Sequence, residues 1–137
     1  MIGLVLVSHG DLGQVLLETA AEIVGPIEPS VALAIGRQQS CDDIEARLRA
    51  AVKQVDRGHG VLILADMFGG TACNISLRII DELRVEVVTG VNLPMLLKVS
   101  TELEGQHEVG ELAQLLKYYG QRNIMVAGDV LKGRAHP

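Results

Sequence analysis

Three stretches of this chain are apolar at almost every position, and they restrict the possible folds more than any other feature. The stretches are "IGLVLV" (residues 2–7), "VALAIG" (31–36) and "GVLILAD" (60–66). A strand with one wet face alternates apolar and polar residues, whereas a strand covered on both faces is apolar throughout. Segments with apolar residues at helical spacing lie between and after these stretches. The pattern therefore predicts alternating strands and helices in an α/β domain with a mostly parallel sheet.

The remaining elements complete a single domain over residues 1–137. We expect helices that begin after Asp11, Ser40 and Asn92, further helices over about 72–83 and 108–119, a fourth strand over 85–90 and a last strand-like run, "NIMVAGD", over 123–129. For a chain of this length we expect a flavodoxin-like three-layer sandwich with the strand order 2-1-3-4. Because the run over 123–129 follows two consecutive helices, we expect it to form an antiparallel edge strand.

Composition and charge exclude several classes of function. Aromatic residues make up 2% of the chain and its formal net charge is −5, so it offers neither stacking platforms nor a basic surface for nucleic acid. Cys41 and Cys73 are too few for a disulfide framework and lack the spacing of metal ligands. The sequence shows no signal peptide and no apolar run of the about 20 residues that cross a membrane. We therefore expect a soluble, cytoplasmic protein.

One histidine is placed where an open parallel sheet binds ligands. Such sheets bind them beyond the carboxyl ends of the strands, at the point where the strand order reverses. In the order 2-1-3-4 this point lies between the first and third strands, which deliver His9 and Asp66 there. The other histidines fall elsewhere: His59 at the amino end of the third strand, His107 in a loop between helices and His136 in the C-terminal tail.

A carboxylate beside a histidine has a direct chemical meaning. By accepting a hydrogen bond from one ring nitrogen, Asp66 would fix the tautomer of His9 and leave the other nitrogen unprotonated. That nitrogen could be a nucleophile, a general base or a metal ligand. Nearby glycines and helix starts suit an anion and favour a nucleophile that carries a phosphoryl group. The residues expected to hold that group are Gly10, Gly69, Gly70 and Thr71.

Other chemistries on related folds fit less well. A receiver-like signalling domain would phosphorylate Asp66, but it needs acidic residues after the first strand, where "SHG" (8–10) stands. A metal-inserting chelatase would need a second histidine across the crevice, and a phosphatase of the Arg-His-Gly type would need arginine in place of Ser8. The residues alone leave one alternative open, in which His9 and Asp66 only support their turns.

Three blocks of the sequence carry a more specific signal. They are "VLVSHGDLGQVLLETAAEIVG" (5–25), "GVLILADMFGGTACNIS" (60–76) and "VVTGVNLPMLLKV" (87–99). Their order and spacing, over essentially the whole chain, resemble the IIA component of the mannose-type (mannose-fructose-sorbose) sugar phosphotransferase system. Phe68 stands where that family often has tryptophan, which is a conservative departure.

The resemblance implies a phosphotransferase that serves sugar transport without a metal or other cofactor. It implies that His9 accepts a phosphoryl group from the histidine phosphocarrier protein, that Asp66 orients the imidazole, and that the group then passes to a IIB partner. No IIB region follows in this sequence, so we expect separate partner chains. A regulatory, phosphorylation-dependent binding module of the same fold is the alternative. The sugar and the IIB partner are not specified by the motifs.

The resemblance also implies two contact surfaces. A partly apolar rim beside the site would dock the two partners in turn, and its residues are Met67, Phe68, Asn92, Leu93 and Met95. Similar proteins form homodimers in which the last strand is exchanged between subunits. This fits the run over 123–129 and would cover an exposed sheet edge. Contact with a membrane is expected only indirectly, through a IIC/IID permease.

Overall fold

The structure is a computed structural model that describes residues 1–67, 74, 78–80 and 82–133. Its sheet has four parallel strands in the order β2-β1-β3-β4, which confirms the predicted order. The strands are β1 (Gly3–His9), β2 (Ser30–Ile35), β3 (Val61–Ala65) and β4 (Val85–Val88). The helices are α1 (Leu12–Val24), α2 (Cys41–Val55), α4 (Leu93–Val99), α5 (Val109–Arg122) and α6 (Ala127–Leu131). Half of the helix expected over 72–83 falls outside the described residues, and the described residues 74 and 78–80 are helical.

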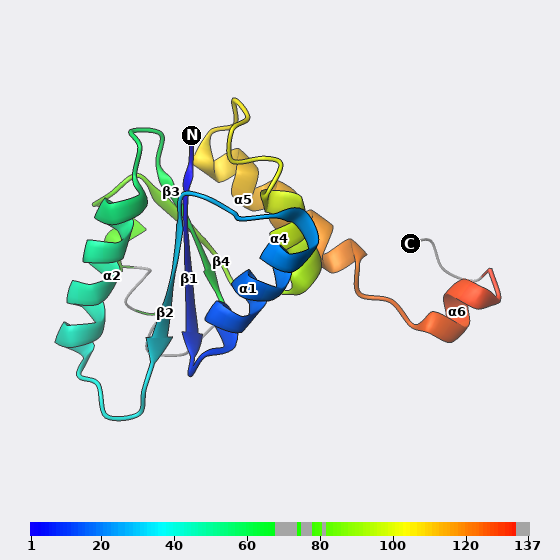
Figure 1. The fold of residues 1–137 in the computed structure, drawn as a ribbon, viewed down its shortest axis with the longest axis horizontal. Coiled ribbons are helices and arrows are strands. Elements are labelled where there is room, and N and C mark those ends of the chain that lie inside the picture. Colours follow the sequence, from blue (N-terminus) through cyan, green and yellow to red (C-terminus); the bar gives the residue numbers. More distant parts are fainter. Residues whose placement is uncertain (68–73, 75–77, 81, 134–137) are drawn as a thin grey trace.

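Helices cover both faces of the sheet, so the predicted three-layer arrangement is also confirmed. Figure 1 shows α2 on one face and α1, α4 and α5 on the other. Successive residues of a strand point to opposite faces. Leu4 and Leu6 of β1 accordingly pack in the core under α1, α4 and α5, whereas Val5 and Val7 pack in the core under α2. Continuous apolar strands are thus needed to fill two separate cores.

Two of the expected helix caps are present. The hydroxyl of Ser40 accepts a hydrogen bond from the Asp43 N–H at 3.1 Å and begins α2. The side-chain oxygen of Asn92 accepts one from the Met95 N–H at 3.1 Å and begins α4. Each of these bonds satisfies a backbone donor in the first turn of its helix. Within the described part of the chain, no helix combines the length and apolar character needed to span a membrane.

The end of α5 differs from the expectation that Gly120 stops this helix. The helix continues to Arg122, and Gly120 is buried inside it. A Cβ at this position would lie 2.6 Å from the Sδ of Met95. Gly120 therefore allows α5 to pack closely on α4, and its role is in packing rather than in helix termination.

The predicted C-terminal edge strand is not a strand in this chain. Residues 124–126 pair with no strand of the described sheet, and α6 follows them. Figure 1 shows α6 set apart from the layered body. The side chains of Ile124 and Leu131 are 75% and 87% exposed. A stretch with strand composition becomes a strand only when another strand edge pairs with it, and a single chain does not bring such an edge to these residues.

Candidate active site

The turn between β1 and α1 is held by a buried serine. Ser8 is almost fully buried, and its hydroxyl accepts a hydrogen bond from the Gly13 N–H at 2.7 Å and donates one to the Gly10 carbonyl at 3.2 Å. Gly10 has a φ of +55°, which glycine adopts without strain. Asp11 precedes the helix as expected, but its side chain makes no capping bond. Ser8 supplies that bond instead, and it also fixes the backbone around His9.

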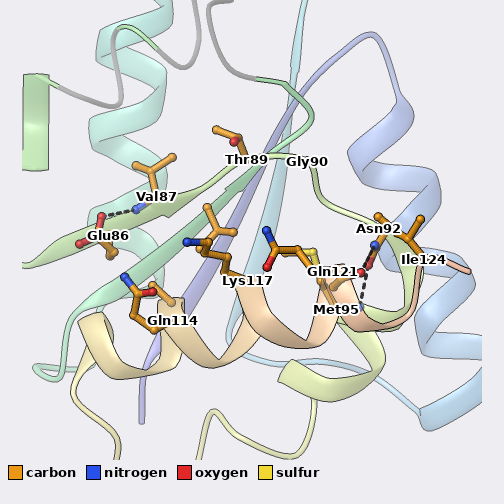
Figure 2. A pocket seen from close by; sticks show the side chains of 13 residues that line it. Glu86, Val87, Thr89, Gly90, Asn92, Met95, Gln114, Lys117, Gln121 and Ile124 are labelled. Atoms are coloured by element: carbon orange, nitrogen blue, oxygen red, sulfur yellow. Dashed lines mark hydrogen bonds between the residues drawn. The ribbon is translucent and has the colours of Figure 1, made fainter. Parts of the chain in front are cut away.

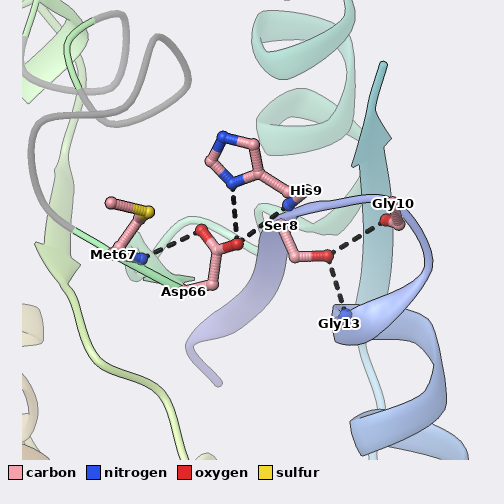
Figure 3. A network of polar contacts seen from close by, with 6 residues as sticks. All are labelled: Ser8, His9, Gly10, Gly13, Asp66 and Met67. Carbon is pink, nitrogen blue, oxygen red and sulfur yellow. Dashed lines mark hydrogen bonds and ion pairs between the residues drawn. The ribbon is translucent and has the colours of Figure 1, made fainter. Parts of the chain in front are cut away.

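A carboxylate and an imidazole meet across the ends of β1 and β3. The Oδ2 of Asp66 lies 2.8 Å from the Nδ1 of His9 and accepts a hydrogen bond from the His9 backbone N–H at 2.9 Å. The Oδ1 of the same carboxylate accepts a bond from the Met67 N–H at 2.9 Å. Figure 3 shows these bonds converging on Asp66. The carboxylate therefore fixes both the backbone and the ring of His9.

The strand register explains why these two side chains meet. Val7 of β1 is the partner of Ala65 of β3, and the Asp66 N–H donates to the Val7 carbonyl at 3.3 Å. His9 is the last residue of β1, and Asp66 directly follows the last residue of β3. The predicted meeting of these side chains at the carboxyl ends of neighbouring parallel strands is thus what the structure shows.

Two opposing effects determine the pKa of Asp66. Partial burial raises the pKa, but the hydrogen bonds from the His9 backbone and ring, the attraction of the His9 ring and the Met67 N–H together outweigh it and lower the pKa below its ordinary value. The carboxylate is therefore ionised at neutral pH and can only accept hydrogen bonds. Consequently the Nδ1 of His9 carries the proton, and in the neutral ring Nε2 presents a free lone pair.

The exposure of the pair suits a reaction with a large partner. The side chain of His9 is 54% exposed, whereas that of Asp66 is 14% exposed. A ring that is fixed at one nitrogen and open to solvent at the other can act as a nucleophile. The geometry therefore supports group transfer at Nε2 of His9.

The other predicted site residues are distributed unevenly. Gly10 adjoins His9, whereas Phe68, Gly69, Gly70 and Thr71 lie outside the described residues. Of the predicted docking rim, Met67 is exposed and Leu93 is half-buried against the core.

Two residues of that predicted rim have structural tasks instead. Met95 is 2% exposed, because α4 turns its side chain into the core beside Gly120. Asn92 caps α4 and also donates a hydrogen bond to the Gly120 carbonyl at 3.2 Å. The side chain of Met95 is therefore mostly withdrawn from the surface, and the amide of Asn92 is already engaged.

The described residues offer no alternative site built on a metal. No three His, Cys, Asp or Glu side chains in that part of the chain lie close enough together to bind an ion. The Nδ1 of His59 lies 2.8 Å from the terminal amine of Met1, and the Nε2 of His107 lies 2.8 Å from Glu102. Both histidines are engaged away from His9, as their sequence positions predict.

Sequence reasoning misses two residues near His9. Ser8 reads as part of the turn after the first strand, and only the spacing to Gly13 hints that its hydroxyl could cap a helix. Arg37 looks like an ordinary surface charge, yet it lines a cleft together with His9. No local pattern predicts that placement, because it depends on the loop that follows β2.

The known proteins that this chain resembles in sequence are described as components of one system. The family model described as "PTS system fructose IIA component", where PTS denotes the phosphotransferase system, matches residues 3–117. The chain is 29% identical over 133 residues to the PTS system fructose-specific EIIA component of Bacillus subtilis, covering 96% of this chain and 90% of that one. It is 28% identical to the PTS system mannose-specific EIIAB component of Escherichia coli, covering 90% of this chain but 38% of that longer protein.

A solved structure agrees with these sequence matches. The mannose/sorbose-specific IIA subunit of the phosphotransferase system from Enterococcus faecalis superposes with a TM-score of 0.81 at 28% identity, covering 91% of this chain and 93% of that one. The parallel fold and the sequence relationships therefore define a component of a sugar phosphotransferase system. The chain belongs to the family of mannose-type PTS IIA components.

The lowered pKa of Asp66 has a consequence for stability. A carboxyl whose pKa is depressed on folding stabilises the folded state above its unfolded pKa of about 3.9, and this contribution is lost as the pH falls through the folded value. We expect Asp66→Asn to lower the free energy of unfolding by about 1–3 kcal/mol near neutral pH. The difference from wild type should shrink below about pH 4. Urea unfolding of both proteins across the acid range measures it, and a deficit that persists unchanged in acid would contradict the assignment.

Proposed function

We propose that this IIA component carries a phosphoryl group on the Nε2 of His9, receives it from the histidine phosphocarrier protein and passes it to a IIB protein. The observation that carries the proposal is the 2.8 Å contact between the His9 Nδ1 and Asp66. This contact leaves Nε2 as the free nucleophilic nitrogen. The family supplies the reaction class, since its members are phosphotransferase components.

The transfer step needs no proton movement. The lone pair of the His9 Nε2 attacks the phosphorus of the donor phosphohistidine in line. The phosphorus–nitrogen bond of the donor breaks, and its electron pair stays on the donor nitrogen. The His9 ring keeps its Nδ1 proton and becomes cationic, and the ionised Asp66 offsets that charge. Passing the group to the IIB partner reverses these roles.

The oxygens of the transferred group need hydrogen-bond donors. We assign this task to the backbone around Gly10, Gly69 and Gly70 and to the hydroxyl of Thr71, as the family resemblance implies. Glycine lets the backbone approach a ligand closely. Of these residues, Gly10 lies next to His9 in the described structure.

Partners would dock on exposed apolar side chains near His9. Met67 follows Asp66 directly and is 54% exposed. Leu12 and Val15, in the first turns of α1, are likewise exposed and follow His9 closely in the chain. A small patch of this kind suits a brief encounter, because transient complexes use small interfaces. Two different partners could then use the same surface in turn.

A homodimer would explain the C-terminal segment. The outer edge of β4 has no neighbouring strand among the described residues, and the Glu86 side chain occupies the Val87 N–H at 3.0 Å. A cavity of about 470 Å³ lies between this edge and α5, and Figure 2 shows its walls from both elements. We propose that residues 124–126 of a second copy, which precede α6, pair with this edge. That pairing would bury Ile124 and Val126.

Phosphorylation tests the carrier role. Incubation with phosphoenolpyruvate, enzyme I and the histidine phosphocarrier protein should add one phosphoryl group, stable in base and labile in acid, seen as a mass gain. We expect His9→Ala to abolish it. Asp66→Asn should slow it by about 10²–10⁴-fold, because the neutral amide no longer favours the reactive tautomer. A wild-type chain that remains unlabelled by an active donor set would refute the carrier role.

The next acceptor separates transport from regulation. Loss of the phosphoryl group from His9 on addition of a IIB protein, with its appearance on that protein, would support sugar transport. Labelling of His9 without transfer to any IIB protein encoded beside this chain would favour the regulatory binding module.

Strand exchange predicts a dimer that depends on the C-terminal segment. Light scattering on a size-exclusion column should give twice the mass of one chain for the wild type. Val126→Asp should give a monomer, because a charge would then enter the new sheet edge. The matched control is Ile23→Asp, which changes an exposed apolar residue of α1. A monomeric wild type, or dissociation by both variants alike, would contradict strand exchange.

A further inference from the structure

A cleft lies on the β2 side of His9, and the function proposed above assigns no role to it. Its volume is about 620 Å³, and its lining includes His9, Gly10, Arg37 and Gln39. Asp66, at the end of β3, contacts His9 from the opposite neighbouring strand. His9 therefore has a second flank, and this flank is built from described residues.

The backbone anchors the loop that carries Arg37. Ile35 at the end of β2 is the register partner of His9, and the Gly10 N–H donates to the Ile35 carbonyl at 3.2 Å. The side chain of Gln39 accepts a hydrogen bond from the Gly36 N–H at 3.1 Å. These bonds hold the chain on both sides of Arg37 and keep this residue at the cleft that His9 also lines.

Arg37 differs from the other described arginines in having no partner in the part of the chain that the structure describes. Within the described residues no hydrogen bond, ion pair or ring contact involves it. The others are all engaged: Arg47 with the Ala34 carbonyl, Arg49 with Glu82, Arg57 with the Gln54 carbonyl, Arg78 with Glu45, Arg84 with Glu108 and Arg122 with the Tyr118 ring. The guanidinium of Arg37 is therefore available for an incoming anion.

Phosphorylation of His9 creates a local need for positive charge. A phosphoryl group brings a charge of about −1.5 to −2, and it would arrive beside the ionised carboxylate of Asp66. Like charges this close repel each other. Among the described residues that line the cleft, Arg37 has the one positively charged side chain. A guanidinium presents two parallel N–H donors, which match two phosphoryl oxygens.

We propose that Arg37 binds the phosphoryl group carried by His9 and stabilises it during transfer. The inference rests on the proposed function only in that His9 is the residue phosphorylated. The contact would form as the phosphorus approaches Nε2 and would persist in the phosphorylated protein. Arg37 is thus assigned as a phosphoryl-binding residue, and not as a docking residue for an acidic partner surface.

A donor that is not a protein tests this assignment without any protein partner. Phosphoramidate transfers its phosphoryl group to histidine, so a role in docking cannot affect the rate. We expect Arg37→Gln to slow labelling of His9 by about 10- to 100-fold, the effect of losing a charge-assisted hydrogen bond in the transition state. Arg37→Lys should recover part of the rate, because lysine keeps the charge but not the paired donors.

The matched control is Arg57→Gln, which removes an arginine charge at the amino end of β3. Its rate and the ³¹P chemical shift of its phosphohistidine should equal those of the wild type, whereas Arg37→Gln should change both. Equal behaviour of the two variants would overturn the proposal, as would a wild-type chain that phosphoramidate does not label at His9.

Labelling by the protein donor gives the independent check on the proposed function. Suppose that the protein donor does not label the wild type, but phosphoramidate labels the wild type faster than Arg37→Gln. This result would refute the carrier role and keep the Arg37 assignment. An increase in KM for the protein donor in Arg37→Gln, with unchanged kcat and unchanged phosphoramidate rate, would show a docking role and overturn the assignment.

Discussion

The contact between the carboxylate of Asp66 and the imidazole of His9 is the interaction on which the site depends. One carboxylate oxygen is shared by the backbone N–H and the ring of His9, so backbone position and ring tautomer are set together. The other carboxylate oxygen accepts a hydrogen bond from the backbone N–H of the next residue, Met67. With three hydrogen bonds on an ionised acceptor, the imidazole has a single favoured orientation. The reactive nitrogen is then directed toward solvent.

The rest of the fold serves to place that contact. Parallel pairing of β1 with β3 brings the two strand ends together, and the two cores hold the strands on both faces. Ser8 ties the first turn of α1 back to the strand end. A nucleophile at a strand end fixed in this way loses little conformational entropy when a partner arrives, which supports fast and reversible transfer. The apolar residues of these strands thus fill the cores, whereas the polar residues at the strand ends form the site.

Much of this arrangement could be predicted from the sequence because it follows from local patterns. Continuous apolar strands indicate a doubly covered parallel sheet, and strand order then places His9 opposite Asp66. The packing role of Gly120 and the burial of Met95 could not be predicted, because each depends on a neighbour distant in the chain. The run over 123–129 has the composition of a strand, but a strand also requires a partner edge.

The most direct test of the account is to locate the proton and the phosphorus on the His9 ring. Long-range ¹H–¹⁵N spectra of the ¹⁵N-labelled chain report which ring nitrogen carries the proton, and ³¹P–¹⁵N coupling reports which one carries phosphorus. We expect a protonated Nδ1 before transfer and phosphorus on Nε2 after it. Phosphorus on Nδ1, the nitrogen that faces Asp66, would contradict this expectation.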